Sequence, residues 1–578
     1  MHPSFHFVAR LALLLLLPLL HLTPVHAQTP LWQTAELAGI PDGSASVSAT
    51  AADAAGNVYL VGQFSGTLTF GSTVLSTQGD VDLFVAKWSN ASRSFVWAQR
   101  AGGSGNDAAT AVALSGSSVY VAGNFTGTAG FGSTSLTSAG AVDVFVTKLI
   151  DAGSTAGFAW AKRAGSAGYD FANALAVNGN AVYLAGQFSS ATTLFDSFAL
   201  INADPNGTST DVFMAKITDL GGNIGFTWAQ RSGEMGQDEA TGLAINGNQL
   251  YLTGFFQGPT TRFGNITLAN ASTSNSQEAF VAKLVDNGPN GTYIWAQRAG
   301  GPGSDRSTAV AVSGSSVYVA GHFTSPSADF GATTLTNAGS GISPGADVFV
   351  AKLTDAGTTS SFAWAQRAGS ADNEVGTGLA VNGPDLYLCG YFGGRTSTFG
   401  TAVLTNTSTG GDNDAFVAKL SDAGPAPAFV WAQKAGGNGG DVASTVAVSG
   451  KRVFVTGLIS TTANFGSLVV SAPAAVGVGS YLATLFDEVL ATAAPQAQPV
   501  LHLYPNPAHT TATVQLPAVP GATSATLVLL DALGREVYRQ PVRLNAPAPV
   551  PVLGLAPGLY RLRVLAGRRV LSQALVVQ

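Results

Sequence analysis

The chain has 578 residues, of which 46% are hydrophobic and only 10% charged, and its formal net charge is −6. This apolar and aromatic content excludes a disordered chain. The charge is uneven, because residues 28–495 carry a net charge of −12 and residues 496–578 a net charge of +5. An acidic N-terminal part argues against nucleic acid as its partner, since phosphate binding requires the opposite sign.

Residues 1–27 are predicted to be a signal peptide. Arg10 precedes an apolar run, Leu11–Leu20, which is too short to span a bilayer. Val25-His26-Ala27 supplies small residues for cleavage between Ala27 and Gln28, and no cysteine follows that would indicate a lipid anchor. We therefore expect an exported, soluble protein without a transmembrane segment, routed through the periplasm.

A repeat dominates the sequence up to residue 486. A segment such as Ser361–Ser370, SFAWAQRAGS, recurs with tryptophan at Trp32, Trp97, Trp160, Trp228, Trp295, Trp364 and Trp431. Successive tryptophans are 65, 63, 68, 67, 69 and 67 residues apart, and only Trp88 falls outside this register. A fixed period of this length indicates a repeat architecture, and we expect the tryptophans to pack between neighbouring repeats.

Each repeat contains the same strand-forming pieces. The repeat that starts at Trp295 continues with a glycine-rich turn to Asp305, then Ser307–Val312, Val317–Gly321 and Asp347–Leu353. β-branched and aromatic runs separated by Gly, Asn, Asp and Ser predict strands and turns, and no window outside the N-terminus shows a sustained helical period of apolar residues. Four antiparallel strands per repeat predict an all-β, seven-bladed β-propeller over residues 28–486. The segment Leu31–Gly39 would complete the last blade, which ends at Ser480–Phe486, and so leave no free sheet edge.

Residues 31–486 resemble the seven-bladed propeller repeat family abbreviated SBBP. The matching residues are Ala54–Gly62, the Gly-Gly-x-Gly-x-Asp of Gly102–Asp107, and Asp414–Leu420. The resemblance implies a propeller but no fixed activity.

One acidic series follows the tryptophan segments and consists of Asp107, Asp170, Asp238, Asp305, Glu374 and Asp441; the first repeat is irregular, with Asp42 nearby. Ring closure would bring these residues to one end of the ring, where they could bind a cation or a polyol ligand. Alternatively each carboxylate accepts backbone N–H groups in its own turn, or pairs with the repeated Arg100, Arg163, Arg231, Arg298, Arg367 and Lys434. We expect the structural alternative, because a functional site usually breaks the symmetry of a repeat.

Other catalytic chemistry has little support. His322 is the one histidine of the repeats and stands where other repeats have Gln63, Asn124, Gln187, Phe255 and Tyr391, which indicates a variable surface position. Cys389 is the only cysteine and is expected to be a buried small residue. A second series, Asp82, Asp143, Asp211, Glu278, Asp347 and Asp414, has lysine five positions on. We expect no catalytic residue, no metal site and no cofactor, and the loops that differ between repeats, such as Asn202–Asp211 and Gly339–Asp347, are better candidates for recognition.

Residues 487–500 form an Ala/Pro/Gln linker, and residues 501–578 are predicted to be a small Ig-like β-sandwich. This tail resembles the C-terminal, type A sorting domain of type IX secretion cargo. The matching motifs contain Pro505, Asn506 and Pro507, then Asp531 and Gly534, then Gly558 and Tyr560. The resemblance implies export from a Gram-negative bacterium by the secretion machinery, removal of the tail, and a secreted or surface-bound product.

These features favour a monomeric, non-catalytic propeller that binds a glycan or a protein outside the cell. Two alternatives remain: a polysaccharide hydrolase or lyase that uses carboxylates alone, and a structural spacer of a surface layer.

Overall fold

The computed structural model describes residues 29–222, 224–340, 345–408, 410–424, 426–487, 501–516, 524–566 and 569–578. These residues form strands and turns, without any helix among them that could span a membrane. They belong to two compact units, Met1–Val489 and Leu490–Gln578. The predicted signal peptide, its cleavage site at Ala27–Gln28 and all of the predicted linker except Asp487 lie outside the described residues.

The N-terminal unit contains seven four-stranded antiparallel arrays, counted over the described residues. The arrays, each given from its first to its last strand, are as follows. Array 1 is β3 (Ala45–Ala52), β4 (Val58–Phe64), β7 (Asp82–Ser89) and β8 (Ser94–Gly103), and array 2 is β9 (Asp107–Ser115), β10 (Ser118–Phe125), β13 (Asp143–Asp151) and β14 (Ala156–Ala164). Array 3 is β15 (Asp170–Asn178), β16 (Ala181–Phe188), β19 (Asp211–Asp219) and β20 (Ile224–Ser232), and array 4 is β21 (Asp238–Asn246), β22 (Gln249–Phe256), β25 (Glu278–Asp286) and β26 (Gly291–Ala299). Array 5 is β27 (Asp305–Ser313), β28 (Ser316–Phe323), β31 (Asp347–Asp355) and β32 (Ser360–Ala368), and array 6 is β33 (Glu374–Asn382), β34 (Asp385–Phe392), β37 (Asp414–Ser421) and β38 (Ala428–Gly437). Array 7 is β39 (Val442–Ser449), β40 (Arg452–Ser460), β43 (Val478–Phe486) and the N-terminal strand β1 (Trp32–Leu37).

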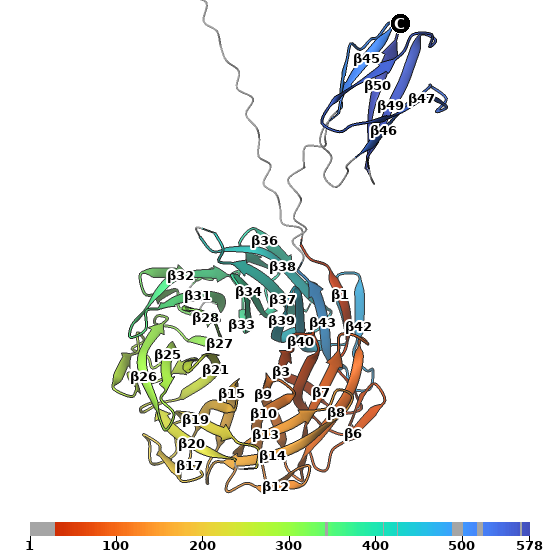
Figure 1. The fold of residues 1–578 in the computed structure, drawn as a ribbon. Helices are drawn as coiled ribbons and strands as arrows, with labels where there is room; N and C mark the ends of the chain where they lie inside the picture. Colours follow the sequence, from red (N-terminus) through yellow and green to blue (C-terminus); the bar gives the residue numbers. More distant parts are fainter. Residues whose placement is uncertain are drawn as a thin grey trace, which may run out of the picture. The chain divides into compact units, whose positions relative to one another are not determined.

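The arrays lie around a common centre (Figure 1). Their first strands contact one another in a cycle, β3 with β9, β9 with β15, β15 with β21, β21 with β27, β27 with β33, β33 with β39, and β39 again with β3. These inner strands contain small residues such as Ala109 and Ala111, which are buried where the arrays converge.

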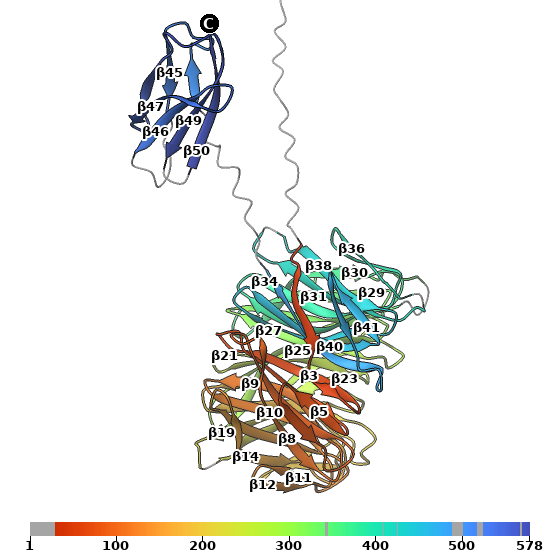
Figure 2. The ribbon, with the colours of Figure 1, turned by 90° about the vertical axis from the view of Figure 1, so that its right-hand side faces the viewer.

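The last array combines both ends of the N-terminal unit. Strand β1 pairs antiparallel with β43 from Trp32 to Leu37, and it lies beside the strands of array 7 in both views (Figures 1 and 2). Its register corrects one sequence expectation. In array 2, Lys148 pairs with Trp160 and Leu149 with Phe158, whereas in array 7 the corresponding Thr484 and Leu485 pair with Thr34 and Trp32.

Trp32 therefore occupies the phenylalanine position of the repeat, and the assumption that it is in register with the other tryptophans is wrong by two residues. Its ring meets Phe465 edge-on at 5.2 Å, as Phe158 meets Phe131 at 6.1 Å. The 65-residue spacing between Trp32 and Trp97 concealed this shift.

A two-stranded hairpin lies outside each array, and six of the seven carry the Phe-Gly pair of the repeat, which is Phe195-Asp196 in the seventh. In β11 (Thr128–Phe131), for example, Phe131 is buried against Phe145 at 4.9 Å, and Gly132 turns the chain at a φ of +61°. The partner of β11 in this hairpin is β12 (Thr134–Thr137). The other hairpins are β5 (Thr67–Phe70) with β6 (Thr73–Ser76), β17 (Thr192–Phe195) with β18 (Phe198–Ile201), β23 (Thr260–Phe263) with β24 (Ile266–Ala269), β29 (Ser327–Phe330) with β30 (Thr333–Thr336), β35 (Thr396–Phe399) with β36 (Ala402–Thr405), and β41 (Thr462–Phe465) with β42 (Leu468–Ser471). The short strand β2 (Ile40–Pro41) also pairs with β5.

A buried polar contact connects each of the first six arrays to the next. Asp151 of array 2 accepts hydrogen bonds from three residues of array 1: Lys87 at 2.6 Å, Tyr59 at 2.7 Å and the Trp97 indole at 3.0 Å. We call this arrangement the latch. The same acceptor position is filled by Asp219, Asp286, Asp355, Asp422 and Asp487, each bonded to the lysine and tyrosine of the preceding array.

The C-terminal unit has two sheets that share one apolar core. The strands are β44 (His502–Tyr504), β45 (Thr511–Gln515) and β48 (Pro547–Pro551) in one sheet, and β46 (Ala525–Leu530), β47 (Glu536–Val542), β49 (Gly558–Ala566) and β50 (Arg569–Val577) in the other. Val514 and Val550 of the first sheet pack with Leu527 and Leu562 of the second.

Candidate binding site at one end of the ring

The predicted acidic series lies at the beginning of the inner strands, but its carboxylates are buried in turns. Each accepts the backbone N–H of the residue four positions earlier, as Asp107 does from Gly103 at 2.7 Å. The equivalent bonds link Asp170 to Ser166, Asp238 to Glu234, Asp305 to Gly301, Glu374 to Ser370 and Asp441 to Gly437. All six side chains are essentially inaccessible, so the geometry favours the structural role over ligand binding.

The repeated basic residues pair with the second acidic series. Arg100 lies 2.6 Å from Asp82, and the pairs Arg163–Asp143, Arg231–Asp211, Arg298–Glu278, Arg367–Asp347 and Lys434–Asp414 follow the same plan. Burial, followed by the nearby charge of Asp82, raises the pKa of Asp107 to about 6 even though backbone hydrogen bonds lower it. Burial likewise raises the pKa of Glu374 to about 7.

The two ends of the ring differ in regularity. At the end where the inner strands finish, polar side chains bond to the next array: Asn178 to the carbonyl of Gly247 at 2.7 Å, Asn246 to Gly314 at 2.9 Å and Asn382 to Gly450 at 2.6 Å. This regular end uses its polar groups to hold the arrays together.

The end where the inner strands begin is variable. One position on each inner strand forms a cross-strand pair that differs in every array, and we call this the variable end. The pairs are Ser46–Gln63, Ala108–Asn124, Phe171–Gln187, Glu239–Phe255, Arg306–His322, Val375–Tyr391 and Val442–Leu458. Because a site on a symmetric scaffold is marked by departures from symmetry, this end is the candidate site.

A contact network crosses arrays 3 to 5 at the variable end, and we call it the Arg306 cluster. The Asn173 amide donates to Glu239 at 3.3 Å, and the other Glu239 oxygen lies 3.6 Å from the Arg306 guanidinium. That guanidinium stacks at 4.0 Å on the ring of Phe255, which is buried. Burial raises the pKa of Glu239, although Arg306 opposes the shift. The Arg306 side chain remains 36% exposed, so it can still meet a ligand.

His322 completes the cluster and corrects the expectation of a surface residue. Its side chain is partly buried, and Nδ1 has no hydrogen-bond partner in the part of the chain that the structure describes. Burial and the neighbouring Arg306 charge lower its pKa to about 4. The imidazole is therefore neutral at physiological pH.

Two aromatic rings of array 3, Tyr169 and Phe171, lie four and two residues before Asn173 of the cluster. Tyr169 and Phe171 stack with nearly parallel planes, 11° apart, at a centroid distance of 6.4 Å. Tyr169 is 56% exposed. The corresponding residues are Asn106 and Ala108 in array 2, and Gln237 and Glu239 in array 4. A solvent-facing aromatic pair is thus a property of array 3 and not of the scaffold.

The remaining sequence expectations concern cysteine, metals and tryptophan. Cys389 is fully buried, and burial raises the pKa of its thiol to about 12. No group of three or more His, Cys, Asp and Glu side chains suited to a metal ion occurs among the described residues. Trp97, Trp160, Trp228, Trp295 and Trp431 are buried, which agrees with the expected packing role between arrays.

The motif residues of the tail have local structural contacts. Asn506, which lies between Pro505 and Pro507, donates to the carbonyl of Ala574 and accepts from the N–H of Val576, which ties it to β50. Asp531 accepts from the N–H groups of Leu533 and Arg535 in the turn that contains Gly534. Tyr560 follows Gly558 at the start of β49 and donates to the carbonyl of Ala556. Asp531, Gly534 and Tyr560 also line one cavity of about 300 Å³, with Arg561 and Arg563.

Comparisons with known proteins bear mainly on the tail. No curated protein sequence matches the chain. Among solved structures, a europium-containing methanol dehydrogenase has 11% identity and a TM-score of 0.32, with 80% of this chain and 96% of that chain covered. A sialidase of Trypanosoma rangeli has 9% identity and a TM-score of 0.29, with 80% and 83% covered. The dimeric latent PorU of Porphyromonas gingivalis has 10% identity and a TM-score of 0.12, with 58% and 32% covered. Similarities this low support no conclusion about activity.

The family comparison is specific. Residues 502–578 match the family described as "Secretion system C-terminal sorting domain". This match covers the two-sheet unit and includes every motif residue named above. The C-terminal unit is therefore a type IX secretion sorting domain, and the protein is exported to the cell surface or beyond it.

Proposed function

We propose that the protein is an extracellular glycan-binding module: a seven-bladed β-propeller whose variable end binds the ligand, delivered by its type IX tail. The seven arrays are the blades, β1 closes the ring, the C-terminal unit is the predicted Ig-like sandwich, and residues 1–27 are the signal peptide that starts export. The tail is then the part that meets the secretion machinery.

The single observation that supports binding is the break in symmetry at the variable end. The turn acids recur in six of the seven arrays and the latches at six of the seven junctions, but the pair at the variable end differs in every array. A rigid scaffold with variable positions at one end is the usual arrangement of a recognition site.

The chemistry of this end fits a sugar chain. The exposed Tyr169 ring and its neighbour Phe171 offer a flat apolar face to the C–H side of a pyranose. Arg306, Asn173 and Gln187 offer donors and acceptors for hydroxyl or carboxylate groups.

The same geometry disfavours glycoside hydrolysis. That reaction requires two carboxyl groups on either side of the scissile bond. The Arg306 cluster contains one carboxylate, Glu239, and it is held by Asn173 and Arg306. The buried turn acids cannot act as the second one without a rearrangement of their turns.

A glycan array probed with the secreted protein tests the proposal. We expect binding of a defined glycan that falls at least tenfold in Phe171→Ala and in Arg306→Gln. Arg262→Gln is a matched control, because Arg262 is an exposed arginine on the outer hairpin strand β23. Equal binding by Arg306→Gln and wild type would contradict the site, and turnover of the bound glycan would show a hydrolase instead.

A further inference from the structure

The junction between arrays 7 and 1 lacks the charged groups that the other six junctions share. Its latch is absent: the lysine, tyrosine, tryptophan and aspartate positions are Thr484, Phe454, Thr34 and Asn90. Thr34 and Thr484 instead bond to each other at 2.8 Å. We call this junction the seam.

The buried carboxylates and the arginine are also missing at the seam. Ala45 stands at the turn-acid position of array 1, since it pairs with Phe64 as Asp107 pairs with Phe125. Gly479 stands at the position of Asp82, and Leu37 at that of Arg100. An Asp–Arg–Asp group is thus replaced by three uncharged residues, two of which are very small.

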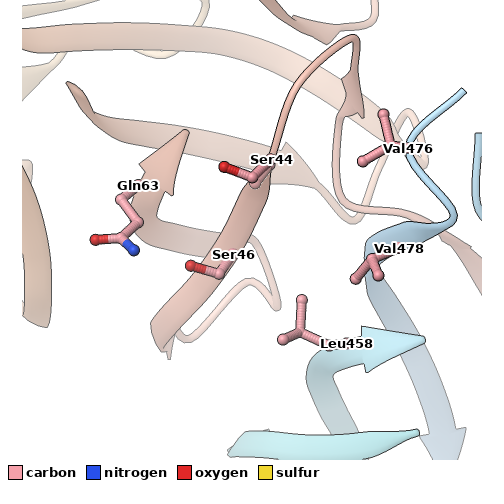
Figure 3. A pocket seen from close by; sticks show the side chains of 7 residues that line it. Ser44, Ser46, Gln63, Leu458, Val476 and Val478 are labelled. Carbon is pink, nitrogen blue, oxygen red and sulfur yellow. The ribbon is translucent and has the colours of Figure 1, made fainter. Parts of the chain in front are cut away.

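A pocket of about 350 Å³ lies beside Ala45 at this junction. Its lining residues are Ser44, Ala45, Ser46, Gln63, Leu458, Val476 and Val478, none of which is charged (Figure 3). Pockets of this size are typical of small-molecule sites.

The two walls of the pocket have different chemistry (Figure 3). Ser44, Ser46 and Gln63 of array 1 supply hydroxyl groups and an amide, and Leu458, Val476 and Val478 of array 7 supply an aliphatic surface. The Gln63 amide is exposed, and neither it nor the Ser46 hydroxyl has a hydrogen-bond partner among the described residues. Donors and acceptors are therefore available on one wall only.

Backbone and side-chain bonds hold both walls in place. Ser44 N–H donates to the Ser65 hydroxyl at 2.9 Å, and the N–H of Ser65 donates to the Ser44 carbonyl at 2.8 Å. On the other wall, Val476 and Gly477 donate to the carbonyl of Pro473 at 3.0 and 2.8 Å. Ser480 joins the walls, because its hydroxyl accepts from the N–H of Val47 at 3.2 Å. A pocket fixed in this way loses little freedom when a ligand enters.

We propose that the seam pocket, which is also part of the variable end, binds one neutral pyranose unit as a second site separate from the Arg306 cluster. The amide and hydroxyl groups match the hydroxyl edge of a neutral sugar, and the aliphatic wall matches its C–H face. Charged sugars are disfavoured because no lining residue can pair with a carboxylate or an amine.

The test uses saturation-transfer NMR with D-glucose, D-galactose, D-mannose and D-glucuronate on the secreted protein. Ser46→Phe fills the pocket with the residue that array 3 carries at that position, Phe171, so the scaffold accommodates it. Gln63→Leu removes the amide and introduces the residue of array 7, Leu458. Ser135→Val is the control, since Ser135 lies on the outer strand β12 where β6 carries Val74.

We expect a signal from at least one of the three hexoses, reduced at least fivefold in Ser46→Phe and in Gln63→Leu but unchanged in Ser135→Val. No signal from any hexose, an undiminished signal in Gln63→Leu, or an equally strong signal from glucuronate would overturn the proposal. Glycan-array binding that depends on Arg306 is measured separately, so failure of the seam site and failure of the proposed function are distinguishable.

Discussion

At the scale of single residues, the two sets of buried carboxyl groups, the turn acids and the latch acids, have pKa shifts in opposite directions. The turn acids have no cation of their own in hydrogen-bond contact, so burial raises their pKa, to about 6 for Asp170 and Asp441. For five latch acids, Asp151, Asp219, Asp286, Asp355 and Asp422, burial acts in the same direction, but hydrogen bonds, chiefly from the lysine and tyrosine, outweigh it and lower the pKa. The same residue type therefore stabilises the fold in different pH ranges.

The turn acids predict that stability falls between pH 5 and pH 8. A carboxyl group whose pKa is higher in the folded state than in the unfolded state stabilises the fold fully below its unfolded pKa, which is near 4. This stabilisation is lost as the pH rises through the folded-state pKa, which is about 6 for Asp107 and about 7 for Glu374. The five latch acids with a lowered pKa contribute above pH 4 and lose that contribution only at lower pH, whereas His322, whose pKa is lowered, opposes the trend. Thermal melting should give a higher Tm at pH 5.5 than at pH 8.

Asp107→Asn is the informative variant for this prediction. The Asn side chain keeps an oxygen that can accept the Gly103 N–H but has no proton to lose. We expect a smaller decrease in Tm between pH 5.5 and pH 8 than in the wild type. A Tm that is constant or rises over this range would show that the turn acids are ionised in the folded state at little cost.

At the scale of strands, the repeat in the sequence was sufficient to predict most elements. The runs around Val317–Gly321 and Asp347–Leu353 are β28 and β31, and the small-residue run Ser307–Val312 lies within β27. The position of Trp32 was mispredicted, because β1 has its tryptophan at the position where the other arrays have phenylalanine, and the 65-residue spacing to Trp97 falls within the range of the other repeats.

The latch and the candidate site were harder to predict. Lys148 and Asp151 form a recurrent Lys-x-x-Asp pattern, but each lysine bonds to the aspartate of the next array, and sequence spacing cannot show this. Arg306, Glu239 and Phe255 meet only because the inner strands of neighbouring arrays converge. The sequence did contain a signal for the site, namely the variable residues at the position of His322. The sequence analysis interpreted this variability as that of a surface position.

The latch predicts a large loss of stability in Asp355→Ala. Lys283 is 3% exposed and bonds to Asp355 at 2.6 Å, so the variant leaves a buried ammonium group without its partner. Removing one member of a buried ion pair costs about 3–5 kcal/mol. The second change Lys283→Met should recover part of this loss, because it removes the unpaired charge.

Urea unfolding measures these differences. Asp196→Asn is the control, since Asp196 pairs with Lys162 at the surface and such pairs contribute less than about 1 kcal/mol. A loss in Asp355→Ala no larger than that in Asp196→Asn would mean that the latch does not stabilise the junction.

At the scale of the N-terminal unit, the seam is where the two ends of the ring are joined. Six junctions carry buried ion pairs, whereas the seam has Trp88 packed edge-on against Phe454 at 6.4 Å, with its indole donating to Glu36 at 2.7 Å. The tryptophan outside the repeat register thus fills the junction that lacks the latch. The loss of charge, the pocket beside Ala45 and the pairing of β1 with β43 all occur at this junction, so closure and the proposed sugar site are structurally linked.

Closure through β1 predicts that a disulfide across the seam stabilises the ring. Thr34 and Thr484 are cross-strand partners with hydroxyl groups 2.8 Å apart, and Thr34→Cys with Thr484→Cys should form a bond between them. Because it joins residues 450 apart, its effect on the unfolded chain is large, and a gain of about 2–4 kcal/mol is expected. The oxidised variant should melt at a higher temperature than the same variant in reductant. Reductant should leave the melting temperature of the wild type unchanged, because its Cys389 is buried and unpaired. Failure of the two cysteines to form a bond under oxidising conditions would show that β1 does not complete array 7 in solution.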